Sequence, residues 1–170
     1  MSFRHTLSLS MIAALGLALP TDHAASQQKS LKEQLTGIWT LVSTVNTAPD
    51  GTKQLLLGDN PKGILILDAS GHYAMINLRG DVPKFKSNNR LKGTPEENTA
   101  AVHGTVAHFG TWSVDDATGT FTQHIEHSMF PNQAGTQNKR SFTVAGDELR
   151  SSNPTPGAGG SNVQLWKRAK

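Results

Sequence analysis

Short runs of β-branched and aromatic residues recur along this chain, and glycine, proline, aspartate or asparagine separates each run from the next. Sixteen glycines in 170 residues are enough for many turns, whereas a helical bundle would need more Leu, Ala, Glu and Lys. We interpret the following segments as strands or strand-like: residues 37–42, 54–57, 63–67, 72–78, 110–114, 121–129, 140–144, 148–152 and 163–168.

Strands joined by local turns predict an all-β fold, namely an antiparallel up-and-down barrel of about eight strands, closed or nearly closed. Such a barrel removes its sheet edges by closing, and at eight strands it can hold one small ligand. A half-open sandwich is the structural alternative. The clearest hairpin joins residues 63–67 to 72–78 through the turn at 68–71.

One helix interrupts the strands. Thr94 fits the N-cap, Pro95 the first helical position, and Glu97 the acid of a capping box, so a helix is predicted from here to about His103. It follows a long polar loop that holds Phe85. An apolar ring in such a loop often folds onto a pocket mouth, so Phe85 is a candidate ligand contact and the helix a candidate lid.

The N-terminal sequence has the layout of a secretory signal. A short basic opening precedes an apolar run at residues 7–19, and this run is too short to span a bilayer comfortably. We predict a signal peptide at residues 1–25, a polar leader at 26–36 and a barrel domain at 37–170. Export places the mature protein in the periplasm or outside the cell, with no stable membrane insertion after cleavage. An uncleaved membrane anchor is the alternative.

Charge and cysteine content exclude several classes of function. The net charge of +3 is small and its cations are scattered, so nucleic acid is not a predicted partner. The chain has no cysteine, which excludes disulfides, zinc–thiolate sites and cysteine nucleophiles. The histidines lack a metal-binding spacing and no phosphate-loop or dinucleotide motif occurs, so neither a metal site nor a cofactor is predicted.

The strand that begins at residue 121 concentrates polar chemistry. Because side chains alternate faces along a strand, His124, Glu126 and Ser128 share one face with Thr122. The other face carries Phe121, Ile125, His127 and Met129. Either face can be the inner one, and the residue types leave this choice open.

Arg140 shares a strand face with Phe142 and Val144, which should point inward, so its guanidinium should point inward too. A buried arginine needs a partner, and Glu126 on the preceding strand is the natural candidate. The resulting hypothesis is an internal cluster of His124, Glu126, Ser128 and Arg140. Arg140 would bind an anionic or carbonyl oxygen and His124 would move protons. Alternatively, the Glu–Arg pair only fixes strand register. Tyr73 could line the same cavity.

Several segments together resemble the lipocalin-like domain of many bacterial and fungal proteins. They are GIWTLVS, PKGILIL followed by DASGHYAMINL, RLKGTPEENTAAVHG, FGTWSVD, HIEHSMFPNQAGTQNKRSF and VQLWKR. The resemblance covers nearly all of residues 36–168 and implies a calyx-like barrel with its ligand inside. It implies no reaction, although some similar barrels are thought to act as cyclases or isomerases. Gln133 stands where many relatives carry an aromatic residue, so a more polar rim is expected.

The sequence thus predicts an exported barrel that binds a small, largely apolar molecule bearing an oxygen function. One alternative is an isomerase or cyclase that acts on a small hydrophobic carbonyl compound, with His124 and Glu126 as acid and base and Arg140 as electrostatic stabiliser. The second alternative is an interaction module with a filled interior. An apolar cavity, a cavity with convergent His and Glu, and a packed interior distinguish the three.

Overall fold

The computed structural model describes residues 29–170, so the signal peptide predicted at residues 1–25 lies outside the described residues. This part of the chain has three helical segments: α1 (Leu31–Leu35), α2 (Pro95–His103) and the 3-10 turn η1 (Pro131–Gln133). The strands are β1 (Gly37–Thr47), β2 (Lys53–Gln54), β3 (Lys62–Leu67), β4 (His72–Leu78), β5 (Thr105–Asp115), β6 (Thr120–Ser128), β7 (Gln137–Ala145), β8 (Glu148–Asn153) and β9 (Ser161–Arg168).

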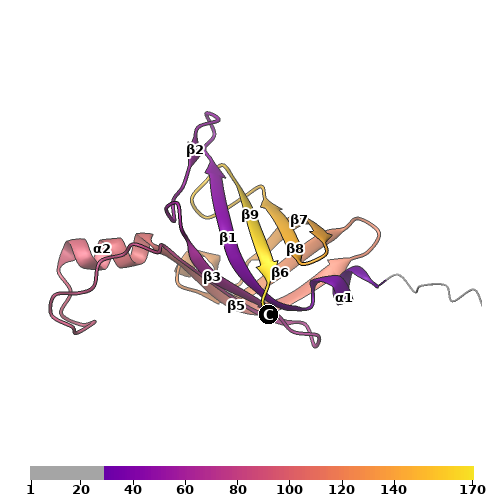
Figure 1. Cartoon of the computed structure of the whole chain (residues 1–170), viewed down its shortest axis with the longest axis horizontal. Helices are drawn as coiled ribbons and strands as arrows, with labels where there is room; N and C mark the ends of the chain where they lie inside the picture. The colour runs from indigo at the N-terminus through magenta and orange to yellow at the C-terminus, as the bar shows by residue number, and fades with distance from the viewer. Residues whose placement is uncertain (1–28) are drawn as a thin grey trace, which may run out of the picture.

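The strands form one antiparallel sheet that closes on itself (Figure 1). Each long strand pairs with its neighbours in chain order, and β1 also pairs with β9 from Trp39 opposite Arg168 to Thr47 opposite Ser161. This last pairing joins β1 and β3–β9 into an eight-stranded up-and-down barrel. The short β2 pairs only with β1 and lies outside the ring. The predicted fold class is confirmed, and the half-open sandwich is excluded by the closing pair.

Helix α1 covers one end of the barrel. A capping box between Ser30 and Glu33 begins it, and Leu35 at its end is buried. The indole of Trp39 donates a hydrogen bond of 2.8 Å to the carbonyl of Leu35. Arg168 lies 4.1 Å from the centre of the Trp39 ring and donates to the carbonyl of Gln34. Figure 1 shows α1 beside the C-terminal end of the chain. These contacts close this end of the barrel.

The barrel interior changes character along its axis because inward-facing positions change from apolar to polar within single strands. On β1, Trp39 and Leu41 are followed by Thr44 and Asn46. The apolar half is a single packed cluster that includes Leu35, Trp39, Leu41, Leu65, Leu67, Tyr73, Met75, Trp112, Phe121, Leu149 and Trp166. The polar half contains Thr44, Asn46, Asn77, His108, Asn138, Arg140, Asn153, Asn162 and Gln164. We call these the closed half and the open half.

Helix α2 begins as its sequence predicts. The Thr94 hydroxyl accepts from the Glu97 amide, and the Glu97 carboxylate accepts from the Thr94 amide, which completes the capping box. The same carboxylate accepts from the Lys86 amide, so it ties the preceding loop to the helix. No residue of α2 is buried, and in Figure 1 the helix and its loop project away from the barrel.

Candidate functional site

A β-bulge in β6 determines which of its side chains face the interior. Up to Ile125 the pairing with β5 is regular, with Gly110 opposite Ile125; beyond it, Phe109 lies opposite His127, so Glu126 is an extra residue. A side chain at Gly110 would collide with the backbone carbonyl of His124, so this close approach requires glycine. After the bulge, Ser128 lies opposite the buried His108. The extra residue therefore turns Ser128 inward.

The bulge overturns the hypothesis of an internal four-residue cluster. Phe121, Gln123 and Ile125 are the buried positions of β6, whereas Glu126 is exposed and His124 is half-buried on the outer side. Placing His124 and Glu126 inside the barrel is therefore wrong. Ser128 and Arg140 are brought to the same cavity, but without the other two. A glycine inside a strand, here Gly110, is the sequence signal that indicates a bulge.

Arg140 faces the interior, as its alternation with Phe142 and Val144 predicts, and only 6% of its surface is exposed. Its Nη1 donates to Oε1 of Gln164 at 3.1 Å, while its Nε has no hydrogen-bond partner among the described residues. The predicted pair with Glu126 does not form. Within residues 29–170 the ion pairs are Arg79–Asp81 and Arg168–Asp147. Burial lowers the pKa of Arg140 to about 10, so it remains charged at neutral pH.

Beside it, Tyr73 and His108 form a buried pair. The Tyr73 hydroxyl lies 2.9 Å from Nδ1 of His108, and the two rings meet edge to face. Burial, together with the positive charge of Arg140, lowers the pKa of His108 to about 4. Burial also raises the pKa of Tyr73 above its ordinary value. Both groups are therefore neutral at pH 7, and the positive charge of Arg140 lowers the pKa of each.

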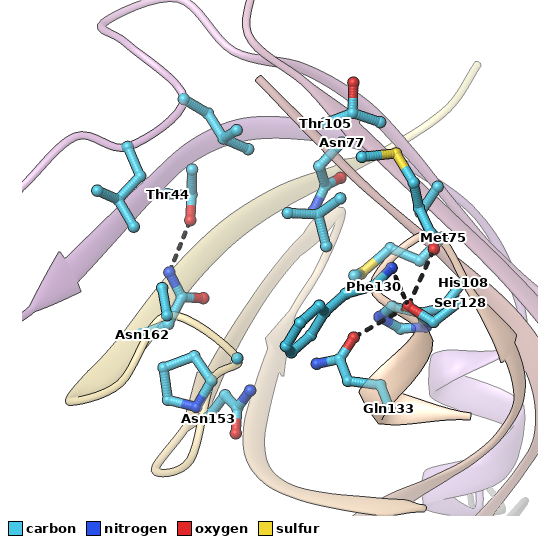
Figure 2. A pocket seen from close by; sticks show the side chains of 18 of the residues that line it. Thr44, Met75, Asn77, Thr105, His108, Ser128, Phe130, Gln133, Asn153 and Asn162 are labelled. Carbon is cyan, nitrogen blue, oxygen red and sulfur yellow. Dashed lines mark hydrogen bonds between the residues drawn. The ribbon is translucent and has the colours of Figure 1, made fainter. Parts of the chain in front are cut away.

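The open half encloses a cavity of about 310 Å³. Its walls are the polar inner positions of seven strands, β1 and β4–β9. Figure 2 shows the labelled side chains arranged around an open space: Thr44, Asn153 and Asn162 on one side, His108, Ser128 and Gln133 on the other. Its mouth is mainly apolar and is lined by Leu56, Leu57, Val102, Met129, Phe130 and Pro156. A molecule inside would therefore meet apolar surface at the rim and amide groups deeper down.

Some polar groups in the open half are well paired. Nδ2 of Asn162 donates to the Thr44 hydroxyl at 2.8 Å and to Oδ1 of Asn46 at 2.7 Å. Others have no partner among the described residues: both amide atoms of Asn77, Oδ1 of Asn138 and Nε of Arg140. All three of these residues line the cavity. Buried polar groups are normally hydrogen-bonded, and four of the six unpartnered buried atoms in residues 29–170 belong to residues of this wall.

Asn77 has its position because of a glycine on the next strand. It pairs with Gly63, and a side chain at Gly63 would collide with Oδ1 of Asn77. The amide therefore occupies the space that the glycine leaves. Asn77 is fully buried in the cavity wall, and neither of its amide atoms has a partner among residues 29–170. The pairing of Gly63 with Asn77 thus leaves a buried amide without a hydrogen-bond partner beside the cavity.

Ser128 organises the rim. Its hydroxyl donates to Oε1 of Gln133 at 3.1 Å and accepts from the Phe130 amide at 3.1 Å. Because Gln133 and Phe130 both line the cavity, Ser128 holds together the turn that carries them. Gln133 places a polar group at the rim, at the position where the sequence predicted one. The role of Ser128 in ligand binding stays a prediction.

Two further predicted site residues do not line the cavity. Tyr73 belongs to the closed half and reaches the cavity only through His108. Phe85 packs over Gly93 within its own loop, so its placement at the pocket mouth is wrong. From α2, Val102 and His103 reach the rim.

Sequence reasoning missed the amide residues of the wall: Asn46, Asn77, Asn138, Asn153, Asn162 and Gln164. Asn162 and Gln164 stand two apart on β9, and Asn46 and Asn138 stand two apart from the inward-facing Thr44 and Arg140 on β1 and β7, which is the pattern of a shared face. That pattern is the signal that identifies them, once the barrel is known to close.

Within residues 29–170, no group of three or more His, Asp or Glu side chains lies together in a way that could hold a metal ion. Over the same part of the chain, no helix is both long and apolar enough to cross a bilayer.

A family model described as a lipocalin-like domain matches residues 36–168. No curated protein sequence matches the chain. Among solved structures, a lipocalin-like protein from Bacteroides uniformis is 12% identical with a TM-score of 0.44, covering 80% of this chain and 99% of that one. Fatty-acid-binding protein 1 of Echinococcus granulosus is 14% identical with a TM-score of 0.38, covering 81% and 99%. A mutant of the fluorescent protein UnaG is 15% identical with a TM-score of 0.37, covering 81% and 98%.

Proposed function

Because this chain belongs to the lipocalin-like domain family over residues 36–168, we propose that it binds one small, largely apolar molecule inside its barrel. The observation that carries the proposal is the cavity of about 310 Å³ in the open half. Small-molecule sites are concave, mostly apolar and equipped with a few convergent polar groups. The apolar mouth and the polar inner wall of this cavity fit that description.

The bound molecule has one orientation along the barrel axis in this proposal. Its apolar part contacts Met129 and Phe130 at the mouth, and its oxygen function reaches the amide and guanidinium groups of the inner wall. The end that α1 covers is packed with the apolar cluster and offers no comparable space. Entry therefore takes place through the mouth between β2, α2, η1 and the loop that follows β8.

Neither alternative function gains support from the structure. The isomerase or cyclase alternative used His124 and Glu126 as acid and base, and both lie outside the cavity. His108 does face the cavity, but with a pKa of about 4 it is poorly matched to proton transfer near neutral pH. The interaction-module alternative requires a filled interior, which the cavity contradicts.

Export is part of the same proposal. It rests on the sequence of residues 1–25, whose basic opening and apolar run have the layout of a secretory signal. Export would deliver the barrel to the periplasm or the medium. Intact-mass measurement of the protein purified from its own host tests this point, because cleavage near Ala25 removes a defined mass. Recovery of only the full-length chain would contradict it.

The binding proposal is tested by native mass spectrometry of the protein purified from its own host, followed by extraction of any bound compound. Ala158 lines the mouth, so Ala158→Trp should block the cavity. Ala117 is exposed in the turn between β5 and β6, so Ala117→Trp is the matched control. We expect one reproducible compound on the wild type and on the control, and its loss from Ala158→Trp. A ligand-free mass for all three proteins would contradict the proposal.

A further inference from the structure

The interior of the barrel contains one charge without a counter-charge. Among the buried polar residues of the described chain, Arg140 is the one charged at neutral pH, and no Asp or Glu is among them. Its guanidinium donates a hydrogen bond to the neutral amide of Gln164. An unpaired buried charge is costly, and a guanidinium has five donors, of which the amide oxygen uses one. The site therefore favours an incoming anion.

A second unmatched group lies next to the first. Asn138 precedes Arg140 by two residues on β7, so both side chains project from the same face roughly 7 Å apart. Oδ1 of Asn138 is buried and has no partner among the described residues, and it can only accept a hydrogen bond. An anion alone cannot satisfy it, because an anion brings no donor. The ligand must carry a donor close to its charge.

A third unmatched group lies on another wall. Asn77 on β4 is fully buried, and neither its amide nitrogen nor its oxygen has a partner within residues 29–170. A group that both donates and accepts, such as a hydroxyl, matches both atoms. A plain alkyl acid would satisfy Arg140 but would leave Asn77 and Asn138 facing hydrocarbon, which costs free energy.

We propose that the ligand of this cavity is a hydroxylated organic acid, whose carboxylate pairs with Arg140 and whose hydroxyl groups bond to Asn138 and Asn77. This rests on the proposed function, since it names the class of molecule that the same cavity takes. The apolar body of the acid lies toward Phe130 and the mouth. Binding would supply the anion, donor and acceptor that these three residues lack.

The anion requirement is tested with two fluorescent dyes that share one aromatic body. Anilinonaphthalene sulfonate carries an anionic group, and N-phenyl-naphthylamine is the same body without it. Charge-assisted hydrogen bonds predict that the wild type binds the sulfonate about 10- to 100-fold more tightly than the neutral dye at pH 7. Arg140→Gln should remove this preference. Arg150→Gln, on the exposed face of β8, is the control that should retain it.

The donor requirement is tested by competition against the sulfonate dye. Phenyllactate and phenylpropanoate differ only in a hydroxyl next to the carboxylate. We expect phenyllactate to displace the dye about 5- to 10-fold more effectively, as one neutral hydrogen bond predicts. Asn138→Leu should abolish the difference. Gln137→Leu, exposed on the same strand, should leave it unchanged.

The outcomes separate this inference from the proposed function. Equal affinity of the wild type for the two dyes would leave small-molecule binding standing and overturn the anionic ligand. A preference for the sulfonate that survives Arg140→Gln would overturn it as well. Equal competition by the two acids would overturn the hydroxyl requirement. Failure of the wild type to bind either dye would contradict the proposed function itself.

Discussion

The closed and open halves of the barrel interior are built by the same strands yet follow different rules. In the closed half, Trp39 donates to a backbone carbonyl and packs under Arg168, and its neighbours are apolar. In the open half, four buried polar atoms have no hydrogen-bond partner among residues 29–170: Nε of Arg140, Oδ1 of Asn138 and both amide atoms of Asn77. Elsewhere in the described chain, Oε1 of Gln123 and Nε1 of Trp166 are the other two such atoms. Apolar packing such as that around Trp39 stabilises a fold, whereas buried polar atoms without hydrogen-bond partners lower its stability. The comparison indicates that the closed half holds the barrel together, and it fits the proposal that the open half binds a ligand.

The largest expected effect comes from the closed half. Trp39→Ala removes a fully buried side chain, its hydrogen bond to Leu35 and its contact with Arg168. We expect the free energy of unfolding to fall by about 3–5 kcal/mol. Denaturant titration followed by circular dichroism measures this change. A loss below about 1 kcal/mol would break the comparison, because the closed half would then not be the stabilising one.

Acid pH should destabilise the protein through His108, at the boundary between the halves. Burial lowers its pKa in the folded state to about 4, from an ordinary value of 6.5. Between these values the unfolded chain binds the proton and the folded one does not, so stability falls as the pH drops below 6.5. We expect about 2 kcal/mol less stability at pH 5 than at pH 7.

His108→Gln is the control for this pH effect, because glutamine does not titrate. Urea titrations of the variant at the two pH values should give similar free energies of unfolding. If the wild type showed the same small difference, the histidine would not be held neutral by its surroundings.

The smallest expected effect comes from replacing single asparagines of the open half, one without a hydrogen-bond partner and one with partners. Asn77→Leu removes two unmatched buried atoms, so we expect stability to rise by about 1 kcal/mol. Asn162→Leu instead removes an amide that donates to Thr44 and Asn46, and should lower stability by about 1–3 kcal/mol. Thermal melts of the wild type and both variants show whether each substitution raises or lowers stability. A loss in both would mean that Asn77 has a structural partner.

Much of the fold follows from local sequence patterns. The turn at residues 68–71 and the capping box at Thr94 each lie within a few residues, so the hairpin and α2 were predictable. The inward direction of Arg140 also followed, because Phe142 and Val144 share its face. Each of these inferences needs only one strand or one turn.

The site was harder to predict because it depends on two features that alternation does not contain. The bulge at Glu126 inserts one residue and reverses the faces that follow, so Ser128 faces inward while His124 does not. The second feature is closure of the barrel, which places the polar faces of several strands inside it. In isolation, residues such as Asn162 and Gln164 look like a solvated strand face, and only the pairing of β1 with β9 encloses them.

The contacts between α1 and the last strand also determine how the protein can be attached to something else. Arg168 reaches the carbonyl of Gln34, so the first and last described segments leave the barrel together, at the end away from the mouth. A tether, a fusion partner or a surface joined at residue 29 or at Lys170 would therefore lie opposite the mouth. The barrel could be immobilised through its ends and still exchange ligand with solution.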